Sequence, residues 1–83
     1  MSISVKFNLF AKPKEVLGVS SVEITVPVDS TIKYCIDSLS IKYPQIKETL
    51  DRSRIAKDCK YIKYDTILNS DAVLTIISPI SGG

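Results

Sequence analysis

Apolar and polar side chains alternate along two early segments of the chain. In residues 3–9 and 22–26 every second residue is large and apolar: Ile3, Val5, Phe7 and Leu9, then Val22, Ile24 and Val26. A period of two is typical of strands with one buried face. Between them, residues 13–17 predict a short helical turn closed by Gly18, and Pro27 ends the second strand. These two strands are expected to form a hairpin.

A longer segment after the hairpin has helical periodicity. Its apolar residues, Ile32, Cys35, Ile36, Leu39 and Tyr43, recur on one face, and Lys33, Asp37, Ser40 and Lys42 fall opposite. This pattern predicts an amphipathic helix that packs one face on a core. Asp29 or Ser30 is the expected N-cap, and Pro44 ends the helix. A further helical turn is expected over residues 45–50.

The rest of the chain predicts three more strands. Residues 55–56 and 61–64 are weak strand candidates, residues 69–71 form a turn, and residues 73–77 read as the final strand. The pattern leaves the strand boundaries between residues 55 and 68 open. This order indicates an α+β fold, with one principal helix on a mixed sheet of four to five strands. We expect a single domain over residues 1–83, with an extended tail at 78–83.

Composition and charge exclude several classes of function. The 83 residues carry a net charge of +2, too weak to favour nucleic acid as a partner. No apolar run approaches the ~18 residues of a membrane span, and the first 20 residues resemble no secretory leader. The expected location is therefore the cytosol.

The chain also lacks the residues of common catalytic sites. It has no histidine and no glycine-rich phosphate loop, so neither a self-contained enzyme nor a permanently bound metal or cofactor is expected. The spacing of Cys35 and Cys59 matches no metal motif. Cys35 falls on the apolar face of the helix and is expected to pack there, whereas the role of Cys59 stays open.

The printed sequence closes with two glycines, Gly82 and Gly83, shortly after the final predicted strand. Pro79 has no backbone N–H for a strand ladder and favours an extended neighbour. Residues 79–83 span up to roughly 16 Å when extended. The tail could therefore carry the carboxylate of Gly83 into a narrow cleft of a partner. A frayed terminus without function is the alternative.

Strand phase places apolar side chains on the face of the sheet away from the helix. If Leu74 and Ile76 face the helix, Ile77 faces away from it, and Phe10 lies opposite the core set of the first strand. Tyr61 or Ile62 could join them. Such a cluster beside the tail favours a partner interface. Scattered surface residues are the alternative.

The two ends of the chain carry its most specific motifs. The N-terminal one is Leu9-Phe10-Ala11-Lys12 with Glu15 and Leu17-Gly18-Val19. The C-terminal one is residues 73–83, ending in P-I-S-G-G. Both resemble the small subunits of molybdopterin synthase, which are ubiquitin-like sulfur carriers. The chain departs from the family pattern at two places. Ser78 stands where the family usually has a proline, and Ser70-Asp71-Ala72 replaces the family's G-D-E turn before the last strand. The resemblance covers essentially the whole chain and implies a β-grasp with the first and last strands central and parallel.

The resemblance also implies a mechanism and partners. An adenylating enzyme would use ATP to adenylate Gly83, and a sulfur donor would convert the adenylate to a thiocarboxylate. The large synthase subunit would then pass this sulfur to cyclic pyranopterin monophosphate, within a heterotetramer. The chain would donate sulfur without being an enzyme on its own. Implied site residues are Gly82 and Ser81 in the threading segment, Ile80 and Pro79 at its exit, and Phe10, Tyr61 and Ile77 at the large-subunit interface.

Other functions would also use a C-terminal tail that ends in two glycines. A ubiquitin-like protein modifier and a sulfur carrier for tRNA thiolation or thiamin synthesis would use the same terminal chemistry. A β-grasp interaction domain with an incidental diglycine is a further alternative.

Overall fold

The computed structural model describes residues 1–78. Its elements, in chain order, are β1 (Ser2–Asn8), α1 (Lys12–Leu17), β2 (Ser21–Pro27), β3 (Ser30–Thr31), α2 (Ile32–Lys42), the 3-10 helix η1 (Pro44–Ile46), α3 (Lys47–Asp51), β4 (Arg54–Lys57), β5 (Lys60–Tyr61), β6 (Ile67–Leu68) and β7 (Ala72–Ile77). None of the helices within this range is long and apolar enough to cross a membrane.

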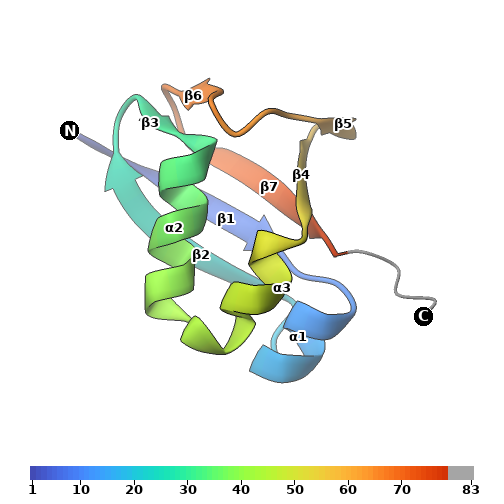
Figure 1. Ribbon diagram of the computed structural model, residues 1–83. Coiled ribbons are helices and arrows are strands. Elements are labelled where there is room, and N and C mark those ends of the chain that lie inside the picture. Colours follow the sequence, from blue (N-terminus) through green and yellow to red (C-terminus); the bar gives the residue numbers. More distant parts are fainter. Residues whose placement is uncertain (79–83) are drawn as a thin grey trace.

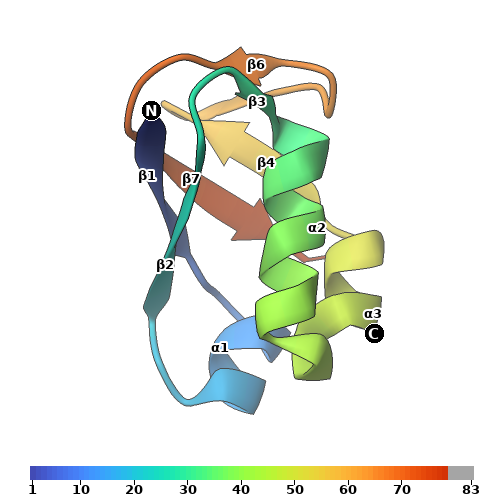
Figure 2. The ribbon, with the colours of Figure 1, turned by 90° about the vertical axis from the view of Figure 1, so that its left-hand side faces the viewer.

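Five strands form one mixed sheet in the order β2-β1-β7-β4-β5. The hairpin β1–β2 is antiparallel, β1 and β7 are parallel, and β4 is antiparallel to both β7 and β5. Helix α2 lies against one face of this sheet, and no helix of residues 1–78 covers the other face (Figures 1 and 2). The predicted α+β class, the hairpin and the parallel pairing of the first and last strands are confirmed.

The core lies between the sheet and α2, as the alternating pattern predicts. Phe7 of β1 is paired in register with Leu74 of β7, and both side chains are completely buried. From the helix, Ile32, Cys35 and Leu39 are buried in the same core cluster. Each fully buried side chain of this size stabilises the fold by roughly 1.5–3 kcal/mol. The packing role predicted for Cys35 is confirmed.

The start of α2 differs from the prediction. Thr31 is the N-cap, and its Oγ1 accepts a hydrogen bond from the Tyr34 N–H at 3.1 Å. Asp29 instead occupies a turn with φ of 66°, and the Ser30 hydroxyl donates to the Pro27 carbonyl at 2.6 Å. Asp29 and Ser30 therefore belong to the turn before the helix, and neither of them is its N-cap. Ser40, predicted to face solvent, is buried.

The segment between β4 and β7 also departs from the expected strands. The predicted strand over residues 61–64 is wrong beyond Tyr61, where β5 ends. The Tyr64 carbonyl accepts the Lys33 N–H of α2 at 2.9 Å, and its hydroxyl donates to the Ser53 carbonyl at 2.9 Å. The chain thus leaves the sheet to cover the start of α2. A small β3–β6 ladder, which the sequence pattern did not predict, follows there.

Candidate functional site

The helix-free face of the sheet carries the predicted interface residues. In β7, Leu74 and Ile76 are buried in the core, so Val73, Thr75 and Ile77 project to the other side. The register sets Thr75 beside Asn8 of β1 and Ala56 of β4. Three adjacent strands therefore contribute to one surface at the end of the sheet where β1 and β7 both finish (Figure 1).

Phe10, Tyr61 and Ile77 lie together on this surface although they are far apart in sequence. They line one hollow of about 390 Å³, which we call the apolar hollow, with Ala56, Cys59 and Thr75. The exposed fractions are 57% for Phe10, 62% for Tyr61 and 36% for Ile77. Ile62, the other candidate, packs against the core instead. The structure thus assembles the predicted cluster, while its role as a partner interface stays a prediction.

The turn after β1 explains why Phe10 is exposed. Leu9 is buried, and its N–H donates to the Ser20 carbonyl at 2.8 Å. Ala11 then adopts a positive φ of 57°, and the chain enters α1 with Pro13 buried in its first turn. The backbone is therefore held on both sides of Phe10, which leaves the ring on the surface.

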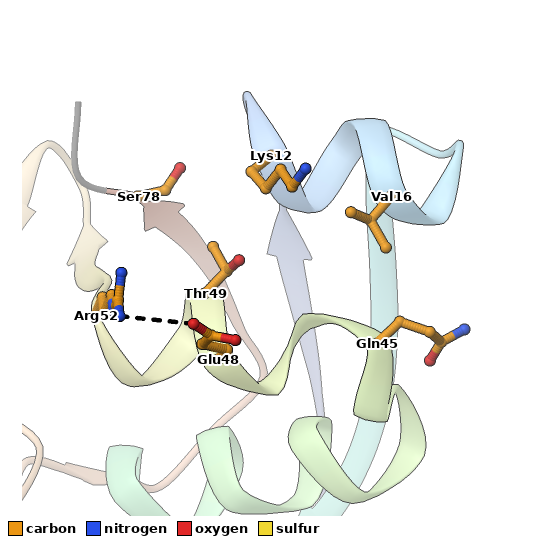
Figure 3. Close-up of a pocket in the computed structure, with 7 residues that line it drawn as sticks. All are labelled: Lys12, Val16, Gln45, Glu48, Thr49, Arg52 and Ser78. Atoms are coloured by element: carbon orange, nitrogen blue, oxygen red, sulfur yellow. Dashed lines mark ion pairs between the residues drawn. The ribbon is translucent and has the colours of Figure 1, made fainter. Parts of the chain in front are cut away.

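A second hollow lies on the helix side of the same end of the sheet. It encloses about 460 Å³ and is lined by Lys12, Val16, Gln45, Glu48, Thr49, Arg52 and Ser78 (Figure 3). Arg52 Nη2 lies 3.5 Å from Glu48 Oε1, and both side chains are mostly exposed, so this ion pair contributes little to stability. Ser78, the last described residue, borders this second hollow, whereas its neighbour Ile77 borders the apolar hollow.

The residues predicted to carry and thread the tail lie outside the described residues. They are Pro79, Ile80, Ser81, Gly82 and Gly83, and their roles stay predictions. What the structure does place is their starting point. Strand β7 ends at Ile77, which lines the apolar hollow together with Phe10, and Ser78 follows directly. A partner that contacts the apolar hollow would therefore lie next to Ser78, the first residue of the tail.

The two cysteines occupy opposite environments. Cys35 is completely buried, and desolvation raises the pKa of its thiol above the ordinary value of 9.0. Cys59 is exposed in the β4–β5 turn, with a positive φ of 66°. The thiol of Cys59 is therefore accessible to reagents and that of Cys35 is not.

This difference predicts two classes of thiol reactivity. In the folded chain, one equivalent of a thiol reagent should react rapidly, at Cys59, and the second only after unfolding. The thiol pKa of Cys35 is raised only in the folded state, because only there is the side chain buried. Its contribution to the free energy of unfolding is therefore fully present below pH 9.0 and falls as the pH rises above 9.0. Labelling followed by peptide mass analysis checks the assignment. Equal labelling rates for both thiols in the folded chain would contradict it.

A mixed sheet with parallel β1 and β7 at its centre and one helix across a face defines a ubiquitin-like β-grasp protein. Within that class the chain belongs to the ThiS family, whose model matches residues 7–83.

Two curated relatives are similar in sequence to this chain over nearly its whole length. The molybdopterin synthase sulfur carrier subunit of Dictyostelium discoideum is 42% identical over 86 aligned positions, which cover 100% of both chains. The protein of the same name from Arabidopsis thaliana is 34% identical and covers 99% of this chain and 85% of its own.

Solved structures agree on the fold. SAMP1, the small archaeal modifier protein 1 of Haloferax volcanii, has a TM-score of 0.84 at 23% identity, covering 96% of this chain and 99% of that one. A chain of the complex of subunits 1 and 2 of the molybdopterin-converting factor from Helicobacter pylori has a TM-score of 0.65 at 21% identity, covering 98% and 100%.

Proposed function

We propose that this chain is the sulfur carrier subunit of a molybdopterin synthase and acts in molybdenum cofactor biosynthesis. The observation that carries the proposal is its similarity to the Dictyostelium sulfur carrier subunit over the full length of both chains. The β-grasp fold and the apolar hollow beside the start of the tail support it.

The chemistry belongs to the carboxylate of Gly83. One oxygen of this carboxylate attacks the α-phosphorus of ATP on an adenylating enzyme, which releases pyrophosphate and forms an acyl-adenylate. A sulfide-equivalent donor then adds to the acyl carbon and expels AMP, leaving a thiocarboxylate. Activation is needed because a carboxylate is a poor acyl donor and AMP is a good leaving group. ATP is therefore a substrate of the adenylating enzyme and not a cofactor of this chain.

The thiocarboxylate is the sulfur source for cyclic pyranopterin monophosphate in the large synthase subunit. Pro79 and Ile80 direct the tail toward that active site, and Ser81 and Gly82 form the segment that threads into it. Gly82 suits this role because it has no side chain to obstruct a narrow channel. Phe10, Tyr61 and Ile77 dock the large subunit. The Helicobacter complex of subunits 1 and 2 supports such a partner, and we propose a heterotetramer in the cytosol.

Intact-mass spectrometry tests the proposed function. The chain is incubated with ATP, sulfide and a molybdopterin-pathway adenylating enzyme. We expect a mass gain that corresponds to replacement of one oxygen by sulfur, located on the C-terminal peptide. An unchanged mass, with an enzyme that is active on its own carrier, would contradict the proposal. Attachment of Gly83 to lysines of other proteins would favour a protein modifier instead.

A further inference from the structure

Arg54 lies on the helix-free face of the sheet, next to two residues that line the apolar hollow, Tyr61 and Ile77. It is paired in register with Ile77 across the β4–β7 ladder, and its neighbour Ile55 is buried in the core on the opposite side. Its guanidinium carbon is 5.4 Å from the centre of the Tyr61 ring. Arg54 therefore contacts Tyr61 and is paired in register with Ile77, and both of these residues belong to the proposed large-subunit interface.

The guanidinium of Arg54 is a cation without a carboxylate partner in the described part of the chain. The ion pairs among residues 1–78 join Lys33 to Asp37, Lys47 to Asp51 and Arg52 to Glu48. None includes Arg54. A guanidinium stacked on an aromatic ring still presents its N–H donors at the edge of its plane. Within residues 1–78 no carboxylate pairs with the donors of Arg54, so they can bind an acceptor on a partner.

We infer that Arg54 selects the docking partner by charge: its guanidinium stacks on Tyr61 and binds a carboxylate that the large subunit presents beside the side chain filling the apolar hollow. This inference rests on the proposed function, which makes the large subunit the occupant of the surface. A carboxylate is the complementary acceptor, because its negative charge offsets the positive charge of the guanidinium and its two oxygens match a planar pair of N–H donors.

Arg54 also acts as a positioning residue for Tyr61. Strand β5 has only two residues, pairs with β4 alone and forms the edge of the sheet. Tyr61 is 62% exposed, so few contacts with its own chain fix the ring. The stacked guanidinium restricts the ring before the partner arrives, which lowers the entropy lost on binding.

The test is titration of this chain with the large subunit of the same organism, at low and at physiological ionic strength. Arg54→Gln should bind about tenfold more weakly than wild type, equal to about 1.4 kcal/mol. Its affinity should also depend less on salt, because the charge pair that salt screens is gone. Lys33→Gln is the matched control, since it removes one exposed cation from α2, in the layer opposite the hollow. It should behave like wild type.

The salt dependence separates a charge contact from a merely structural effect, which would weaken binding equally at both ionic strengths. Unchanged affinity of Arg54→Gln, or an unchanged salt dependence, would overturn the inference, and the proposed function would stand if wild type still binds. Failure of the wild-type chain to bind a folded large subunit would overturn the inference and count against the proposed function.

Discussion

Deletion of Gly83 should abolish sulfur transfer and leave the fold unchanged. Removing one residue withdraws the terminal carboxylate by about 3.5 Å along an extended tail. Even a displacement of about 1 Å can lower a reaction rate on the order of a hundredfold, because the reacting atoms no longer meet in a productive geometry. Neither thiocarboxylate in the mass assay nor molybdopterin in a reaction with the large subunit is expected.

Two measurements keep this result specific. The thermal unfolding midpoint of the deletion variant should match wild type, because the sheet and its core lie within residues 1–78. Gly83→Ala is the matched variant, since it keeps the carboxylate at its original reach and adds only a methyl group. It should retain measurable sulfur transfer. Molybdopterin formation by the chain without Gly83 would refute the assignment of the reactive group.

Replacement of Phe10 with lysine should weaken large-subunit binding by at least about thirtyfold, or roughly 2 kcal/mol. Phe10 is the aromatic residue of the apolar hollow nearest to α1, and lysine would bring an unpaired charge into a desolvated contact. Stability should change by less than about 0.5 kcal/mol, because the ring is 57% exposed. Calorimetric titration measures the first effect and thermal unfolding the second.

Ile41→Lys provides the control for this substitution. Ile41 is 82% exposed on α2, in the layer opposite the helix-free face. The same apolar-to-cationic change there should leave large-subunit affinity unchanged. Equal affinities for Phe10→Lys and wild type would count against the docking surface, although the chemistry proposed for Gly83 would be unaffected.

The sequence predicted the sheet best where one face of a strand is buried along its whole length. In β1 alternation was enough to assign Phe7 to the core. In β7, where nearly every residue is apolar, the inward position of Leu74 followed from the sequence only as a condition, and the structure shows that this side chain is buried. It failed after Tyr61, because Tyr64 leaves the sheet to bind α2 and Ser53, partners distant in sequence. The two-residue strands β3 and β6 are too short to show any period.

The candidate site was predictable to a similar extent. Phe10 and Ile77 follow from strand phase once β1 and β7 are neighbours, whereas Tyr61 also needs the register of β4 with β5. Arg54 gave no signal in the sequence. Both residues after it, Ile55 and Ala56, are buried, so β4 shows no alternation from which its exposed face could be inferred.

The five-stranded sheet cannot form until β7 has been synthesised, because this strand lies between β1 and β4. The hydrogen bond from the Ser4 N–H to Asp71 Oδ1 spans 67 positions, and such contacts form slowly because a long loop must first close. A nascent chain that stops before Ala72 would therefore lack both its central strand and the Ile77 side of the apolar hollow. Cellular proteases would meet it unfolded, and an interrupted chain would not compete with complete carriers for the large subunit.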